Sequence, residues 1–145
     1  MVPALASLLA RARKAGVFVL YSTREPESSN WMPEVAPAPG DPVVKSVGQD
    51  RFYSTDLDKT LKAKGITTVI LTGWKISGSV VYTSVGATLR GYTVVVPTDA
   101  SLAATDYEVA IGQFQILNQN SANATNESLK ANASTLSRTD MIVFQ

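Results

Sequence analysis

The stretch that decides the fold is residues 67–96, which reads TTVILTGWKISGSVVYTSVGATLRGYTVVV. It opens with a short β-branched run at residues 67–72 and closes with another at residues 92–96. Neither run alternates polar with apolar residues, as is typical of strands covered on both faces. Between them, apolar residues recur at helical spacing, namely Val81, Val85 and Leu89. Strand, helix and strand in this order predict two parallel strands joined by a right-handed crossover.

The same alternation continues on both sides of this unit. An amphipathic helix is expected before Gly16, followed by a strand at residues 17–21. A second helix is expected between Thr55, which with Asp58 resembles a capping box, and Gly65. We therefore predict one α/β domain over residues 1–145, a three-layer α-β-α sandwich with a mainly parallel sheet.

The C-terminal part of the chain adds a further helix and a further strand to this prediction. The last strand is expected within residues 135–144, where Met141–Phe144 is the apolar run. The last helix is expected to bury one apolar face, made by Tyr107, Ala110, Ile111, Phe114 and Leu117.

Two segments are predicted to be loops. Residues 24–44 hold five of the seven prolines and are expected to form a surface loop long enough to shape a pocket. Residues 118–134 are polar and are expected to be the weakest-structured part. This segment contains three matches to glycosylation acceptors, at Asn123, Asn126 and Asn132, although Asn-rich loops also produce such matches by chance.

The composition excludes whole classes of chemistry. The chain has no Cys and no His, so it cannot use a thiolate nucleophile, a Ser-His-Asp triad or an imidazole-ligated metal, and no cofactor is expected. A net charge of +1 gives no field that favours nucleic acid or an anionic membrane. No apolar run approaches the roughly 20 residues of a membrane span, and the start does not resemble a signal peptide. We expect a cytoplasmic protein whose partner is a small neutral ligand or another protein.

The candidate site lies beyond the carboxyl ends of the parallel strands, where ligands bind in open α/β sheets. The segment Gly73–Ser79 runs there from a buried strand into a helix, and its N–H groups are expected to point into the crevice. Such a helix start can stabilise an oxyanion, and Gly78 lets the backbone approach a ligand. The alternative is that Ser77 or Ser79 only caps the helix and that Gly78 only permits close packing.

Other residues are expected to face the same crevice. Lys45 follows the apolar residues Val43 and Val44, which could carry its amine into the crevice, where a desolvated lysine can transfer a proton or stabilise an anion. The alternative is a solvated surface charge. The remaining candidates for substrate binding are two cations and three aromatic residues that could equally belong to the core, namely Arg24, Lys75, Phe52, Tyr53 and Trp74.

The run Val43–Ala100 resembles the heart of the isochorismatase-like superfamily, also called the cysteine hydrolases. In that family a Lys precedes a segment of the form F-x-x-T-x-L-x-x-L, and a strand ending in Gly stands six residues before the nucleophile. A Thr follows four residues later, and then a G-Y/F-x-V-x-V strand. The positions that match these features are Lys45, Phe52, Thr55, Leu57 (one place late), Leu61, Gly73, Ser79, Thr83 and Gly91-Tyr92.

The resemblance implies hydrolysis of a small amide- or ether-type substrate by an Asp, a Lys and a Cys. Lys45 corresponds to the Lys, and Ser79 stands in the place of the Cys. It also implies a non-proline cis peptide near Trp74-Lys75. Serine is a poor nucleophile without a base, and Lys45 could be that base only as a neutral amine.

The family Asp lies at the end of a first, central strand, and no residue of this chain matches it. A parallel sheet without its middle strand would leave backbone groups unpaired, so we expect another segment, possibly from a symmetry mate, to fill or cover the gap. Three functions follow as hypotheses: a hydrolase, a non-catalytic relative that binds a small molecule or a protein, and a structural subunit completed by a partner. A homo-oligomer is expected.

Overall fold

The structure is a computed structural model that describes residues 2–25, 30–119 and 121–145. Residues 26–29 of the predicted Pro-rich loop and residue 120 of the predicted polar loop lie outside the described residues. The described chain alternates helices and strands, and none of its helices is long and apolar enough to span a bilayer.

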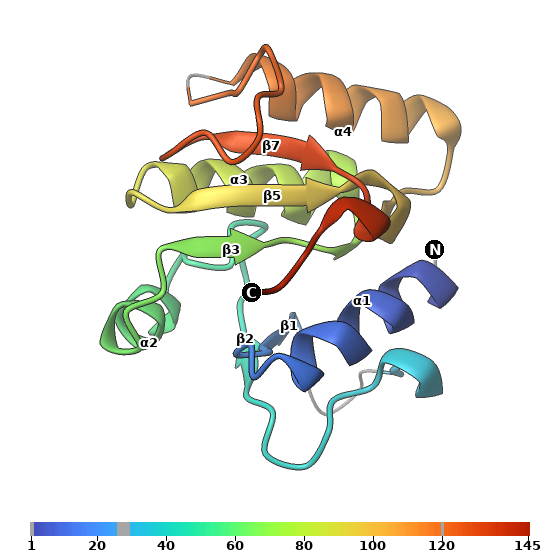
Figure 1. The fold of residues 1–145 in the computed structure, drawn as a ribbon, viewed down its shortest axis with the longest axis vertical. Coiled ribbons are helices and arrows are strands. Elements are labelled where there is room, and N and C mark those ends of the chain that lie inside the picture. Colours follow the sequence, from blue (N-terminus) through green and yellow to red (C-terminus); the bar gives the residue numbers. More distant parts are fainter. Residues whose placement is uncertain (1, 26–29, 120) are drawn as a thin grey trace.

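Every pairing between the described strands is parallel, as the sequence predicts, but the sheet falls into separate parts (Figure 1). The main part has three strands in the order β3, β5, β7, with the bounds Thr68–Ile70, Thr93–Pro97 and Ser134–Ser137. The second part pairs β1, Tyr21–Thr23, with β2, Val43–Lys45. The third pairs β4, Gly73–Trp74, with β6, Ser101–Leu102.

Helices cover the sheet on both sides and give the three-layer α-β-α arrangement. Their bounds are Val2–Lys14 for α1, Leu57–Ala63 for α2, Val81–Thr88 for α3 and Asp106–Asn118 for α4. Helices α3 and α4 pack on β5 and β7. Helix α1 packs on the short turns that follow these strands, η4 (Thr98–Ala100) and η5 (Thr139–Met141), and on η2 (Pro33–Val35).

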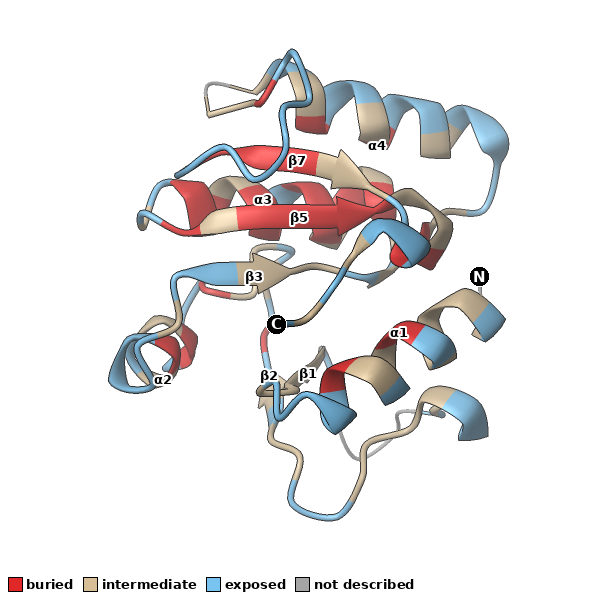
Figure 2. Cartoon of the chain, viewed as in Figure 1, coloured by how far each residue is buried: buried red, intermediate tan, exposed pale blue. Residues whose placement is uncertain are grey.

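The core is centred on β5 and on the segments that pack against it. Val94 and Val96 of β5 are fully buried, as are Ile76 and Ile116. Figure 2 shows the contrast with the other half of the molecule: β5 is mostly buried, whereas neither β1 nor β3 contains a buried residue. Strand β3 therefore lacks cover on the side away from β5.

The first strand begins later than the sequence predicts. The run at residues 17–21 was expected to be a strand, but only Tyr21 of this run belongs to β1, because β1 pairs with β2 alone and that pairing starts opposite Val43. Residues 17–20 have no neighbouring strand among the described residues. The expected gap in the sheet is thus found between β1 and β3.

Two C-terminal predictions are wrong. Residues 141–144 are not a strand: the last strand is β7, and the turn η5 follows it. Helix α4 buries Gly112 and Ile116, whereas Tyr107 is 75% exposed and Phe114 64% exposed. The face of α4 that meets the core contains Gly112. A prediction based on large apolar residues does not find this face, because glycine has no side chain.

The polar stretch after α4 is ordered by its asparagines. Asn123 is fully buried; its side-chain amide donates to Thr135 Oγ1 at 2.8 Å, and its side-chain carbonyl accepts the Glu127 N–H at 3.0 Å. Asn126 accepts the backbone N–H of Leu136 at 2.8 Å. These asparagines therefore add side-chain bonds to the single parallel bridge between Ala122 and Ser134 beside β7, and a buried Asn123 does not present a glycosylation acceptor.

Candidate active site

The segment after β3 pairs with β6 and then leads through a tight turn into α3. Its first residues form β4, and Gly73 has a φ of +110°, a conformation that favours glycine. The peptide bond between Trp74 and Lys75 is cis, which confirms the expectation drawn from the resemblance. The π-helical turn η3, Ile76–Val80, then leads directly into α3.

Helix α4 holds this turn by close backbone contact. A Cβ atom added to Gly112 would lie 2.9 Å from the carbonyl carbon of Ile76 and 2.9 Å from the nitrogen of Ser77. Gly112 therefore has no room for a side chain. Because it has none, α4 packs directly against the backbone of the turn. Gly78 lies beside Gln49, whose Oε1 would be 3.2 Å from an added Cβ.

Ser79 is half-buried in this turn, and its hydroxyl makes a single hydrogen bond. The hydroxyl donates to the carbonyl oxygen of Trp74 at 3.4 Å. Among the described residues no carboxylate or amine forms a hydrogen bond with Ser79. The N–H groups of Gly78 and Val80 both donate to the Lys75 carbonyl, at 3.1 and 3.2 Å, so these two amides do not point freely into the crevice as expected.

A crevice of about 430 Å³ opens in front of Ser79. It brings together four of the predicted site residues: Arg24, Lys75, Gly78 and Ser79. Three further polar residues line it that were not named as site residues, namely Gln49, Arg51 and Ser77. Gln49 and Arg51 lie between Lys45 and Phe52, which were candidates, but no motif distinguishes them from ordinary loop residues.

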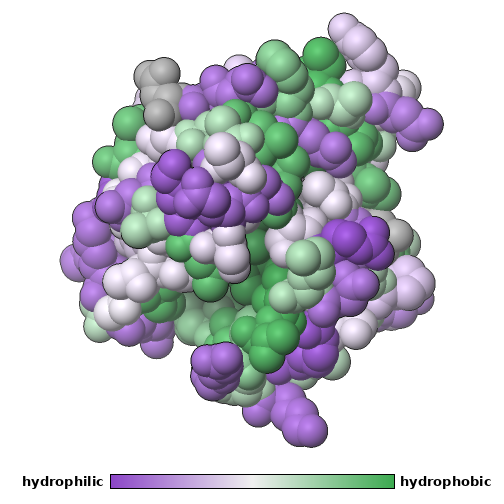
Figure 3. Space-filling view, turned by 45° about the horizontal axis from the view of Figure 1, so that its top comes forward, coloured by the Kyte–Doolittle hydropathy of each residue, from purple (hydrophilic) through white to green (hydrophobic). Residues whose placement is uncertain are grey.

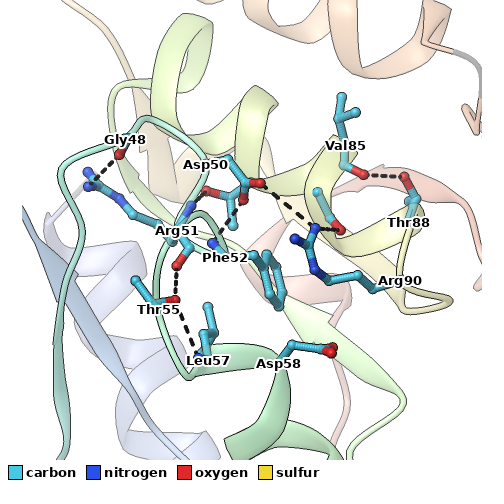
Figure 4. A network of polar contacts seen from close by, with 12 residues as sticks. Gly48, Asp50, Arg51, Phe52, Thr55, Leu57, Asp58, Val85, Thr88 and Arg90 are labelled. Atoms are coloured by element: carbon cyan, nitrogen blue, oxygen red, sulfur yellow. Dashed lines mark hydrogen bonds and ion pairs between the residues drawn. The ribbon is translucent and has the colours of Figure 1, made fainter.

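Arg51 is fixed in the crevice wall by its neighbours in the loop (Figure 4). Its guanidinium donates to the carbonyl oxygens of Ser46 and Gly48, each at 3.2 Å. Its backbone N–H donates to Thr83 Oγ1 at 3.1 Å, and Thr83 donates to the Gln49 carbonyl at 3.3 Å. Thr83 of α3 thereby ties the loop to the helix that follows Ser79.

The crevice is electropositive. Burial lowers the pKa of Arg51, and the nearby positive charge of Arg24 lowers it further. Lys75 forms an ion pair with Glu108 of α4, and its hydrogen bond holds the pKa of that carboxyl below its usual range. Neither Arg24 nor Arg51 forms an ion pair among the described residues, so both can attract an anionic ligand group into the crevice.

Lys45 does not join this group. It ends β2 with an exposed side chain and does not line the crevice, so the expected buried approach to Ser79 is not found. The physical reason is the alternation of side chains along a strand: Val43 and Lys45 share the exposed face, and Val44 faces inward.

The three aromatic candidates have different roles. Phe52 is buried in the core, where it stacks on Tyr92 with ring centroids 5.7 Å apart, and it does not line the crevice. Tyr53 is 61% exposed and does not line the crevice. Trp74 is 60% exposed and borders a second, larger cavity on the other side of Ser79.

The described residues offer no ready metal site. No group of three acidic side chains gathers in the part of the chain that the structure describes. The chemistry available at the crevice is therefore that of a hydroxyl, backbone amides and cations.

Known proteins share both the sequence pattern and the fold. The isochorismatase domain family model matches residues 1–124. Streptothricin hydrolase from Streptomyces noursei is 33% identical over 104 residues, which are 64% of this chain and 41% of that protein. Ureidoacrylate amidohydrolase RutB from Methylobacterium radiotolerans is 37% identical over 67 residues, 46% of this chain and 26% of that protein. The chain thus spans less than half the length of these curated relatives.

Solved structures with this fold cover almost the whole chain. An isochorismatase family protein from Desulfovibrio vulgaris superposes with a TM-score of 0.78 at 23% identity, over 96% of this chain and 80% of that one. N-carbamoylsarcosine amidase from Thermoplasma acidophilum superposes with a TM-score of 0.72 at 24% identity, over 97% and 83% of the two chains. Together with the cis peptide and the placement of Ser79, the match of the family model over most of the chain shows that this protein belongs to the isochorismatase family.

Proposed function

We propose that the crevice binds a small amide- or ether-type substrate that carries an anionic group, and that Ser79 is the nucleophile of its hydrolysis. The observation that carries this proposal is that Ser79 shares one crevice with Arg24 and Arg51, neither of which forms an ion pair among the described residues. Relatives named as an amidohydrolase and an amidase support an amide substrate.

For an amide, the reaction would proceed in two steps. The Ser79 oxygen bonds to the carbonyl carbon, the C–N bond breaks, and the hydroxyl proton goes to the departing amine. Water then hydrolyses the ester and releases the acid. Arg24 and Arg51 hold the anionic group and so orient the carbonyl beside Ser79. Lys45 serves as base or anion stabiliser only if it moves toward the crevice.

One observation favours a second function, ligand binding without turnover. The Ser79 hydroxyl donates to a carbonyl and has no base among its described contacts, so nothing seen in the structure removes its proton. Binding by the arginines does not require that proton to move.

A combined binding and turnover experiment separates the two functions. A panel of small amides, esters and vinyl ethers, each with and without a carboxylate, is tested for product formation and for thermal stabilisation. A hydrolase forms product from the anionic compounds, and Ser79→Ala reduces the rate at least about 100-fold, while Ser7→Ala on the exposed face of α1 leaves it unchanged.

A binder is stabilised in a saturable manner by the same compounds without product. In either case Arg51→Met weakens binding of the anionic compounds about 10-fold or more and leaves the neutral ones unchanged. Absence of both product and stabilisation over the whole panel rejects both functions.

The expectations of a homo-oligomer and of a cytoplasmic location remain part of this proposal. Light scattering coupled to size exclusion measures the mass in solution, and a monomeric mass rejects the oligomer. Fractionation of cells that carry the natural gene tests the location.

A further inference from the structure

Ser79 lies between two hollows of different character. The larger has a volume of about 770 Å³, is lined mainly by apolar side chains and lies in the gap between β1 and β3. Figure 3 shows apolar atoms gathered around a hollow in the lower half of the molecule. The smaller is the crevice of about 430 Å³, whose lining includes Arg24, Arg51 and Lys75. A ligand with an anionic group therefore gains most from the crevice, where these cations orient it.

The loop that carries Arg51 lies along one face of α3, the helix that begins just after Ser79 (Figure 4). Thr83 of α3 accepts the Arg51 N–H and donates to a carbonyl of the same loop. One turn further along α3, Gly86 faces the side chain of Asp50. Residues three apart in a helix lie on the same face. The loop is therefore attached to α3 at two neighbouring points.

The carboxylate of Asp50 lies directly against the backbone of α3 at Gly86. A Cβ atom added to Gly86 would lie 2.5 Å from Oδ1 of Asp50 and 2.6 Å from Oδ2, which is too close for a side chain. Oδ1 also accepts the N–H of the buried residue Phe52 at 2.9 Å. The carboxylate therefore cannot turn away from α3 without leaving this N–H unpaired, which is costly.

Arg90 ties the Asp50 carboxylate to the same helix. Its guanidinium donates to the Gly86 carbonyl at 2.7 Å and lies 3.8 Å from Asp50 Oδ2, within ion-pair distance. It also lies over the ring of Phe52, 4.9 Å from the ring centroid. Asp50 does not line the crevice and is paired with Arg90, so its charge does not neutralise Arg51.

Arg51 follows Asp50 directly and is fixed to the same loop. Its guanidinium donates to the carbonyls of Ser46 and Gly48. The hydroxyl of the buried Ser46 in turn donates to the Asp50 carbonyl at 3.3 Å. The guanidinium therefore moves with the loop, and the loop is held by α3. Because α3 begins next to Ser79, a single helix relates Arg51 to Ser79.

From these contacts we infer that Asp50, docked on Gly86 and paired with Arg90, is a positioning residue that fixes Arg51 relative to Ser79, and that the crevice thereby selects ligands by the length between their anionic group and their amide. The inference rests on the proposed function, in which Arg51 holds the anionic group and the amide lies beside Ser79. Two contact points at a fixed separation accept one spacer length and reject shorter and longer ones. A loosened loop lets Arg51 follow the ligand, so the length preference is lost before binding is.

A series of ligands of graded length tests the selection. The probes are malonamate, succinamate, glutaramate and adipamate, in which one to four methylene groups separate an amide from a carboxylate. NMR titration of the whole chain registers both binding and hydrolysis. The parent is expected to bind one length at least about 10-fold more tightly than the others. Gly86→Ala is expected to reduce this preference to less than about threefold, although alanine favours a helix more than glycine does.

Two further variants show whether Gly86 acts through Asp50. Asp50→Ala removes the carboxylate and is expected to lose the length preference to the same degree. Adding Gly86→Ala to Asp50→Ala is expected to change nothing more, because the new Cβ has no carboxylate to displace. Leu89→Ala is the control and keeps the preference of the parent, since Leu89 is 74% exposed at the end of α3. Additive effects of the two substitutions overturn the inference.

Hydrogen exchange of the ligand-free chain gives a readout that depends on no ligand. The Phe52 N–H is expected to exchange at least about 10-fold faster in Gly86→Ala than in the parent. The Val94 N–H, which donates to the Ala133 carbonyl at 2.9 Å in the core, is expected to exchange as before. Unchanged exchange at Phe52 rejects the positioning role, whatever the parent binds.

The outcomes separate this inference from the proposed function. If the parent binds no compound of the series, anion binding at the crevice is rejected together with the length selection, and hydrogen exchange still decides the positioning role. If the parent binds all four lengths equally well, the proposed function stands and the inference is overturned.

Discussion

The buried hydroxyl of Tyr92 gives a prediction in which both the sign and the size follow from the structure. Tyr92 is 2% exposed, and its hydroxyl donates to Asp58 Oδ1 at 2.9 Å and to the Asp58 carbonyl at 3.3 Å. Burial, and then the hydrogen bond and negative charge of Asp58, raise the pKa of Tyr92 from 10.0 to about 12. The neutral phenol is therefore favoured in the folded state.

The raised pKa fixes the pH window of the effect. Below pH 10 the contribution of Tyr92 to stability is fully present. Between pH 10 and about 12 the unfolded chain ionises and the folded chain does not, so the contribution falls and is lost above the folded pKa. A shift of two pKa units corresponds to about 2.7 kcal/mol in the free energy of unfolding.

The assay compares the parent with Tyr92→Phe by urea unfolding from pH 8 to pH 12. The parent is expected to be more stable below pH 10, and its advantage is expected to shrink by about 2 to 3 kcal/mol over the next two pH units. Tyr82→Phe is the control, because it removes the hydroxyl of a tyrosine that is 53% exposed on α3. A stability difference between parent and Tyr92→Phe that does not change with pH would refute the reasoning.

Three further substitutions test how the site and the C-terminal half are held. Gly112→Ala should lower the free energy of unfolding by about 1 to 3 kcal/mol and weaken ligand binding at the crevice, since the new Cβ displaces the backbone of η3; urea unfolding and thermal shift measure both. Asn123→Ala should cost about 1 to 3 kcal/mol because it leaves buried partners unsatisfied, whereas the exposed Gln115→Ala should change unfolding by less than about 0.5 kcal/mol. Asp99→Ala removes the acceptor of the Thr139 N–H and hydroxyl, at 2.9 and 2.7 Å. Burial alone would raise the pKa of Asp99, but these bonds outweigh it and lower the pKa below 3.8, so the stability loss should be full above pH 3.8 and disappear as the pH falls further.

The sequence predicts the parts of the fold that depend on local pattern. The strand, turn and helix of residues 67–88 are found in place. These features are encoded within a few residues of each other, by β-branched runs and by the placement of glycines. The same is true of α1, whose apolar spacing is that of an amphipathic helix. The cis peptide at Trp74-Lys75 is also found, but that expectation came from the family resemblance and not from local pattern.

The parts that the sequence does not predict depend on contacts between distant segments. The buried face of α4 is set by Gly112, which is selected for the absence of a side chain against η3. The strand β7 is polar, and it is held by pairing with β5 and by side chains such as Asn123 rather than marked by an apolar run. Arg51 is placed in the crevice by carbonyl groups of its own loop and by Thr83, which no spacing rule reveals.

The position of Lys45 connects the site with the cavity. Strand β2, which carries Lys45, is attached to the sheet only through β1, and β1 faces β3 across the open cavity. Neighbouring strands lie about 4.8 Å apart, so a strand in the cavity would fix β1 and β3 at roughly twice that spacing. A segment that fills the gap between β1 and β3 would therefore also set the position of β2, and with it Lys45, relative to Ser79. Lys45 lies outside the crevice in the described chain. It can act as the base of a hydrolase only if filling the cavity brings it within reach of Ser79.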